Sequence, residues 1–220
     1  MAKFEKASVS DKIAGYVDSR KKILLCCVII VVVAIAAFAL VTGITSSASK
    51  KGLSAVDTIS YTLTDNSSEL NDEELAQRKE TALAALQVYN KKGGVVGVRA
   101  NMLSADIYYS NKDYEKAAES YVQAALKGKK AYTSPIVYFN AAVSYENAGN
   151  KEKACEYYEK ASNDKDFLLA SRAAFELGRV KLALDDKDGA SEAFKKVYDK
   201  DPDSSWGKLA KTELLKLENK

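Results

Sequence analysis

The sequence predicts an all-α protein in which one transmembrane helix near the N-terminus precedes a row of helical hairpins. The transmembrane helix is predicted by an uncharged apolar run at residues 23–41. The hairpins are predicted by small and aromatic residues at spacings of three, four and seven, which is the periodicity of one helix face. The same pattern recurs at intervals of 37 and 36 residues, so we expect similar helical units to stack on one another.

The N-terminal segment 1–22 is polar and holds the excess positive charge. It carries six basic and three acidic residues, whereas the rest of the chain carries 27 of each sign. A nucleic-acid-binding domain would need a basic face, so nucleic acid is not an expected partner. We expect 1–22 to be a cytoplasmic tail with little fixed structure. A short amphipathic helix beginning near Ser10 is the alternative, which its thin apolar face disfavours.

The apolar run, extended through residue 44, has the length of a membrane span. Its nineteen uncharged residues, at ~1.5 Å per residue, nearly cross a hydrocarbon core. A cleavable signal peptide is the alternative, because the small residues 46–48 could form a cleavage site. The apolar region of a signal peptide is only ~7–15 residues long, so we expect an uncleaved transmembrane helix at 23–44. Cys26 and Cys27 lie too near the start of the run for a lipoprotein signal.

Basic residues lie closer to the N-terminal end of this span than to its C-terminal end. Arg20, Lys21 and Lys22 adjoin the run, whereas Lys50 and Lys51 lie farther from it. The positive-inside rule therefore places the N-terminus in the cytoplasm and residues 45–220 across the membrane. We expect a short linker of Ser, Ala and Lys residues at 45–52.

A degenerate helical hairpin is expected at 53–97, and a capping helix at 203–220. Apolar residues in 53–64 have a helical spacing, and 65–68 are typical of a turn. A helix over 69–89 is indicated by one apolar face and by acidic residues in its first turn, where the helix dipole favours them. Gly93, Gly94 and Gly97 separate this hairpin from the repeats. Trp206 and Leu209 begin the helical pattern that would cover the end of the stack.

Three units, at 98–132, 134–166 and 170–202, carry small and aromatic residues at matching positions. These are Ala105, Tyr108, Ala117, Tyr121 and Ala124, then Ala142, Tyr145, Ala154, Tyr158 and Ala161, then Gly178, Lys181, Ala190, Phe194 and Val197. This pattern, with Leu177-Gly178 and Pro202 in the third unit, resembles the tetratricopeptide repeat (TPR) family, whose unit is a helical hairpin of 34 residues. Three departures are the absence of the family's Trp, Lys181 in place of Tyr, and no closing Pro in the first two units.

No pattern for catalysis or cofactor binding is found in the sequence. The chain has no His, so imidazole-based triads and metal sites are excluded. Its glycines lack the strand and spacing of a phosphate loop, and Pro202 interrupts the acidic stretch 199–203, which cannot form a calcium loop. Cys155 is expected to be a half-buried, unreactive thiol. We expect no enzyme, no cofactor and no metal.

Stacked hairpins supply a concave groove lined by the first helix of each unit. The TPR resemblance implies nine groove-facing residues: Met102, Asp106, Tyr109, Phe139, Val143, Glu146, Phe175, Arg179 and Leu182. The apolar members could equally complete the core. The family's clamp for a C-terminal carboxylate needs Lys and Asn where this chain has Met, Asp, Phe and Val, so that specificity is not implied. An apolar groove suits an unfolded segment or a partner's helix.

The layout of anchor, linker, degenerate hairpin and three repeats resembles bacterial inner-membrane TPR proteins that accompany the secretory translocon and periplasmic chaperones. The ending 201–217 resembles the last repeat of periplasmic TPR proteins that coordinate envelope assembly. These resemblances imply a single-pass protein of the bacterial inner membrane whose periplasmic domain binds protein segments, translocon components or chaperones, as an accessory of translocation or folding. The alternative is a structural component of an envelope complex, with one fixed partner or with itself. The oligomeric state stays open.

Overall fold

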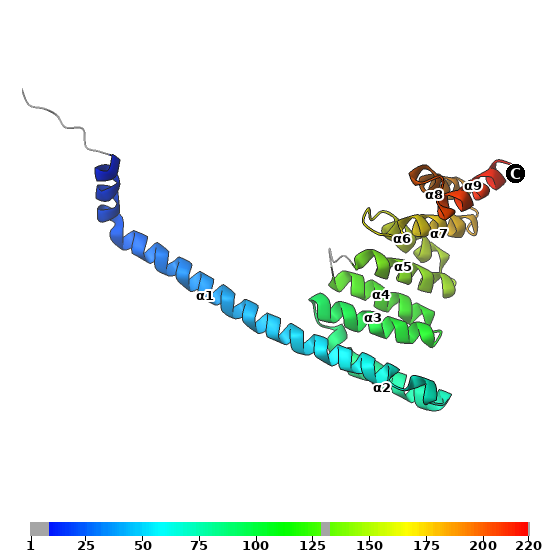
Figure 1. The fold of residues 1–220 in the computed structure, drawn as a ribbon, viewed down its shortest axis with the longest axis horizontal. Coiled ribbons are helices and arrows are strands. Elements are labelled where there is room, and N and C mark those ends of the chain that lie inside the picture. The colour runs from blue at the N-terminus through cyan, green and yellow to red at the C-terminus, as the bar shows by residue number, and fades with distance from the viewer. Residues whose placement is uncertain (1–8, 129–132, 220) are drawn as a thin grey trace, which may run out of the picture. The chain divides into compact units, whose positions relative to one another are not determined.

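The computed structural model describes residues 9–128 and 133–219, which are built from helices (Figure 1). In these residues nine α-helices and one 3-10 helix follow one another without a strand, so the expected all-α class is confirmed. The contacts divide the chain into two units, 1–50 and 51–220. Parts of three expected segments lie outside the described residues: 1–8 of the tail, 129–132 of the first repeat and 220 of the cap.

Helix α1 (Val9–Thr64) carries the apolar run in the first unit. Its most apolar window has a mean hydropathy of 3.4 and no buried residue, so the helix is long and apolar enough to cross a membrane. The threonine hydroxyl groups near the C-terminal end of the apolar run form hydrogen bonds within the helix. Thr42 Oγ1 donates to the Phe38 carbonyl at 3.0 Å, and Thr45 Oγ1 donates to the Val41 carbonyl at 2.9 Å.

The segment 45–52, expected to be a linker, is helical and lies within α1. It contains no proline, and its Thr45 hydroxyl bonds the preceding turn, so nothing in it ends the helix. Gly52 lies at a tight helix contact, because a Cβ there would lie 3.0 Å from the Val96 side chain. The described part of the tail is also helical from Val9 onward and continuous with the apolar run.

The second unit begins with a hairpin formed by the end of α1 and α2 (Asp72–Asn90). The connection contains η1 (Ser67–Glu69) and ends at Asn71, whose side chain and Glu74 form a reciprocal capping box. Val56 of α1 and Leu86 of α2 are buried against the next helix. That helix, α3 (Gly94–Ser110), starts four residues earlier than expected. Gly97 allows this, because a Cβ there would lie 2.0 Å from the Lys92 carbonyl oxygen.

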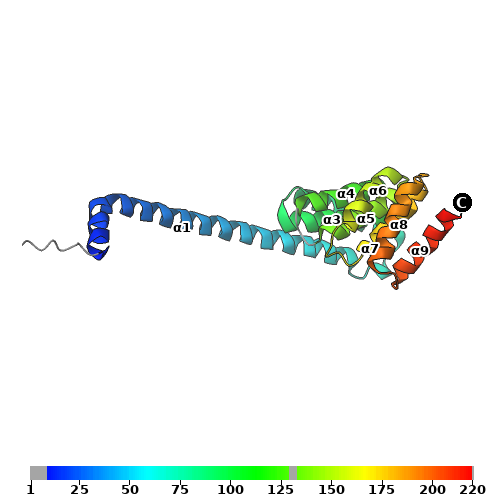
Figure 2. The ribbon, with the colours of Figure 1, turned by 90° about the horizontal axis from the view of Figure 1, so that it is seen from above.

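Three hairpins and a terminal helix complete the second unit. They are α3 with α4 (Tyr114–Lys127), α5 (Ser134–Asn147) with α6 (Lys151–Ser162), α7 (Ala170–Leu182) with α8 (Lys187–Lys200), and α9 (Ser205–Glu218). From α2 to α9 each helix packs on the next along the chain, and α9 lies against α7 as well as α8 (Figure 2). The described part of the expected cap is therefore a helix that covers the last hairpin.

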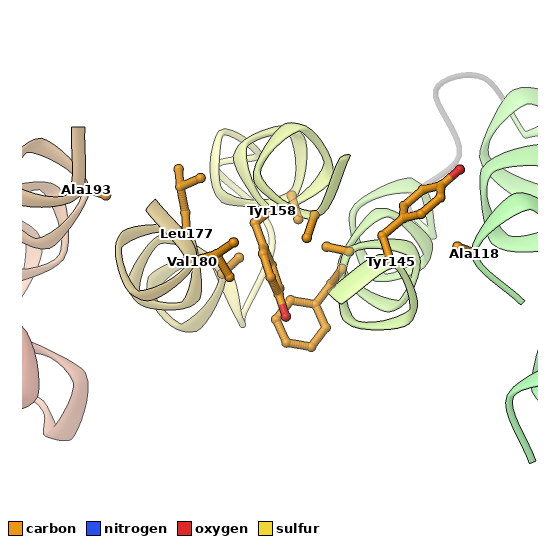
Figure 3. Packing of buried hydrophobic residues seen from close by; sticks show 11 residues of the cluster. Ala118, Tyr145, Tyr158, Leu177, Val180 and Ala193 are labelled. Atoms are coloured by element: carbon orange, nitrogen blue, oxygen red, sulfur yellow. The ribbon is translucent and has the colours of Figure 1, made fainter. Parts of the chain in front are cut away.

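The core between the hairpins is made from small residues facing rings, as the sequence pattern predicts. Ala142, Ala154 and Ala161 are fully buried, which lets neighbouring helices approach closely. Tyr158 is 2% exposed and lies between Leu177 and Val180 of α7 on one side and the helix that bears Tyr145 on the other (Figure 3).

Each of the three hairpins turns through one residue with a left-handed backbone. These residues are Lys112 (φ 62°), Gly149 (φ 83°) and Asp185 (φ 60°), at matching positions of the three repeats. The amide of the next residue in each turn donates at 2.9 Å to the carbonyl of Tyr108, Tyr145 or Lys181. This bond satisfies a carbonyl that the helix end would leave unpaired.

Candidate protein-binding surface

A hollow of about 240 Å³ opens where the first helices of the three hairpins meet. Helix α5 supplies its central residues because α5 belongs to the middle hairpin. Tyr109 comes from α3, Tyr121 from α4 and Arg172 from α7. This hollow is lined by Tyr109, Tyr121, Phe139, Asn140, Val143, Ser144 and Arg172.

Three of the nine residues expected in the groove line the hollow together. Phe139 is 6% exposed and packs edge-on against Tyr158, with ring centroids 5.6 Å apart, so it forms part of the core beneath the hollow. Val143 is half-buried, and Tyr109 is 37% exposed. The Tyr109 hydroxyl accepts a hydrogen bond from Asn147 Nδ2 at 3.2 Å. Apolar surface that a partner could cover is thus contributed mainly by Tyr109 and Val143.

The Asp106 carboxylate, also expected in the groove, is bound to the neighbouring helix. The Tyr121 hydroxyl of α4 donates to Asp106 Oδ1 of α3. Although the Asp106 side chain is partly exposed, desolvation by its neighbours raises the pKa of the carboxyl group, and the hydrogen bond from Tyr121 opposes that rise. Burial is also the main cause that raises the pKa of the Tyr121 hydroxyl, so this hydroxyl is a donor at neutral pH.

Glu146 and Arg179, the other charged residues expected in the groove, bind each other. Arg179 Nη2 of α7 lies 2.6 Å from Glu146 Oε1 of α5, and Arg179 Nε lies 2.7 Å from Glu176. The Tyr158 hydroxyl of α6 donates to Glu146 Oε2 at 3.1 Å. One carboxylate therefore connects three successive helices, which fixes the second hairpin to the third.

The remaining expected residues pack into hydrophobic clusters and do not line the hollow. Met102 packs with the cluster shared by α3, α4 and α5. Phe175 lies 5.3 Å from the Phe194 ring and 5.5 Å from the Trp206 ring, and Leu182 belongs to the same cluster. The expected apolar stripe is therefore divided, because α9 supplies Trp206 to cover its C-terminal part.

Arg172 and Asn140 were missed by sequence reasoning, although both line the hollow. The Arg172 guanidinium lies 5.2 Å from the centre of the Phe139 ring and 6.0 Å from that of Trp206. Arg172 precedes Phe175 by three residues on the same helix, which is the spacing that places two residues on one face. Extending each expected helix face by one turn toward its N-terminus would have found it.

The hollow presents apolar surface at Tyr109 and Val143 and N–H donors at Asn140 and Arg172, which are groups that can bind a protein segment. Within the described residues, no group of three or more His, Cys, Asp or Glu side chains could hold a metal ion. Cys155 is half-buried, and burial is the main cause that raises the pKa of its thiol, so little thiolate forms at neutral pH.

Comparison with known proteins agrees with the repeated hairpins. Three tetratricopeptide repeat models match residues 76–135, 136–163 and 172–204. The first match begins within α2 and so extends the similarity upstream of the expected first repeat. A "TPR repeat-containing protein" of Treponema pallidum (strain Nichols) is 32% identical over 126 residues, covering 57% of this chain and 53% of the relative. This chain thus matches about half of that relative's length. The protein belongs to the tetratricopeptide repeat family, whose repeats form protein-interaction scaffolds.

Proposed function

We propose that this protein is a membrane-anchored scaffold that captures segments of partner proteins at the hollow, as an accessory of protein translocation or of folding in the periplasm. The observation that carries the proposal is the hollow itself, where residues from α3, α4, α5 and α7 meet at an open surface. A volume of about 240 Å³ lies below the ~300–1,000 Å³ of typical small-molecule sites. It suits one or two side chains of a protein segment.

The anchoring part of the proposal is supported by α1. Its apolar window is long enough to span a bilayer, and Arg20, Lys21 and Lys22 adjoin its N-terminal end. A bacterial inner membrane with the N-terminus in the cytoplasm would satisfy the positive-inside rule. The second unit would then lie in the periplasm, where it would meet chains that emerge from a translocon.

The proposal is tested by photocrosslinking in native membranes. A photoreactive phenylalanine derivative replaces Tyr109 in the hollow, and the matched control replaces Tyr61, which is 65% exposed on α1 in the same unit. We expect crosslinks from position 109, and not from position 61, to emerging chains, translocon subunits or periplasmic chaperones. One fixed partner, or this chain alone, would support a structural component of an envelope complex. Equal products from both positions would contradict capture at the hollow.

The membrane position is tested separately. The anchored chain should stay with membranes during extraction at alkaline pH, which releases peripheral proteins. A single cysteine at exposed Lys195 of α8, in a chain whose other cysteines are replaced by serine, should react with a membrane-impermeant maleimide in cells with a permeable outer membrane. Labelling only after the inner membrane is broken would place the domain in the cytoplasm.

A further inference from the structure

Arg172 is the one charged side chain among the described residues that line the hollow. It lies in the first turn of α7 and is exposed. Its guanidinium group faces the rings of Phe139 and Trp206. Across residues 9–128 and 133–219, it forms neither an ion pair nor a hydrogen bond to a protein acceptor. Its N–H groups therefore remain available to a ligand.

The other charged groups expected on this surface are already bound. Asp106 accepts a hydrogen bond from Tyr121, and Glu146 is paired with Arg179. Glu176 also binds Arg179. Arg172 thus has no competitor for an incoming negative charge in the hollow, while the neighbouring carboxylates would repel a segment that carries several negative charges.

The rings of Phe139 and Trp206 restrict the Arg172 side chain in a way that favours anion binding. A guanidinium over an aromatic face is attracted by the ring electrons, and its planar N–H fork can still bind a carboxylate through two parallel hydrogen bonds. Contacts with Phe139 of α5 and Trp206 of α9 limit the rotation of the Arg172 side chain. Less conformational entropy is then lost when an anion binds.

We infer that the hollow recognises an internal protein segment in which one acidic side chain accompanies one large apolar side chain. This inference rests on the proposed function. The carboxylate of the segment binds the N–H fork of Arg172, and its apolar side chain covers Tyr109 and Val143. The half-buried Asn140 lies among the same lining residues and can bond the backbone of the segment. We assign a side-chain carboxylate, because an internal segment, such as one that emerges from a translocon under the proposed function, has no terminal carboxylate to offer.

The test is selection of peptides from a random library with fixed, amidated C-termini, using the full chain in detergent micelles. The wild-type protein should select Asp or Glu at a constant distance from Leu, Ile, Phe or Met. The Arg172→Glu variant should bind the selected peptides at least about tenfold more weakly, the equivalent of one charge-assisted contact, and should itself select Lys or Arg at the acidic position. Lys195→Glu changes the net charge equally outside the hollow and should retain the wild-type preference.

Two outcomes overturn the inference and separate it from the proposed function. Peptides without an acidic preference, whose binding is lost in Tyr109→Ala, would leave capture at the hollow standing and remove the role of Arg172. The absence of any selected peptide would count against both. A free C-terminal carboxylate that improves binding, in peptides remade with and without the amide, would replace the side-chain carboxylate by a terminal one. Thermal unfolding of each variant checks that the loss of binding does not come from loss of structure.

Discussion

The second and third hairpins, α5–α6 and α7–α8, build the same turn from different residues. In both, the amide after the left-handed residue donates at 2.9 Å to the first helix, from Asn150 to Tyr145 and from Asp186 to Lys181. In both, the side chain of that residue then caps the second helix. The two hairpins thus share the backbone of the turn and the position of the capping side chain, although the residues differ.

The hairpins differ at the ring of their second helix. Tyr158 of α6 has a hydroxyl group, which donates to Glu146 of the same hairpin at 3.1 Å. Phe194 of α8 has no hydroxyl group, is fully buried and lies so close to Gly178 that a Cβ there would be 2.7 Å from its ring. The Tyr158 ring is matched by a hydrogen-bond acceptor, Glu146, whereas the Phe194 ring is matched by the missing side chain of Gly178.

The two hairpins also differ in the residues beside the turn. Lys153 lies 4.8 Å from the centre of the Tyr145 ring, whereas Lys181, at the position that matches Tyr145, pairs with Asp186 at 3.2 Å. Gly189 stands at the position that matches Lys153, beside the side chains of Lys181 and Asp186. These repeats therefore vary in compensated sets of residues, so a single residue moved from one hairpin to the other should lower the stability of the protein.

The largest effect is expected from exchanging the small residues of the two hairpins. Gly178→Ala should lower the free energy of unfolding by about 2 kcal/mol, since overpacking costs up to about 3 kcal/mol and the better helix former returns about 1 kcal/mol. Adding Phe194→Leu should recover part of the loss. Urea unfolding of the full chain in micelles, followed by circular dichroism, measures both.

The matched change is Ala142→Gly, which should also destabilise, by about 1 kcal/mol, through helix propensity and a small cavity. Opposite substitutions at matching positions would then both be unfavourable. If Gly178→Ala raised the midpoint instead, the close approach of Phe194 to this glycine would be wrong.

A smaller effect is expected from exchanging the rings. Phe194→Tyr should cost about 1.5 kcal/mol, because a buried hydroxyl would find Leu182 where the second hairpin has Glu146. Tyr158→Phe should cost about 1 kcal/mol, the net value of one hydrogen bond, because Glu146 keeps its pairing with Arg179. The melting temperature of each variant is the measurement, and equal stability of Phe194→Tyr and the wild type would show that the third hairpin has an acceptor of its own.

Core positions that depend only on the residues of one repeat could be predicted from the sequence. The buried Ala142, Ala154 and Ala161 and the ring of Tyr158 recur with the helix period, so their positions could be derived before the structure. Phe139 and Phe175 were expected in the groove, yet each is covered by a residue outside its own helix, Tyr158 for the first and Trp206 for the second. Family offsets describe a helix face and not the neighbour that will lie against it.

The candidate site was predictable to the same limited extent. Tyr109 and Val143 could be placed at a common surface because both lie at repeated offsets of first helices. Arg172 could not, since its importance comes from the rings of two other helices and from its lack of an ion pair within the described chain. The helical segment 45–52 was missed for a related reason, because small polar residues permit either a linker or a continued helix.

The smallest effect is expected at the turns, where Gly149 and Asp185 share a left-handed backbone. Gly149→Ala should cost about 1 kcal/mol, because a Cβ destabilises this conformation by about 1–2 kcal/mol and a less flexible unfolded chain offsets part of that. Asp185→Gly should change stability by less than about 0.5 kcal/mol, since aspartate tolerates this region and glycine adds freedom to the unfolded chain. Comparison of urea midpoints tests the difference. Equal losses in the two variants would mean that the turn geometry is not shared, and the likeness of the two hairpins would then be confined to their helices.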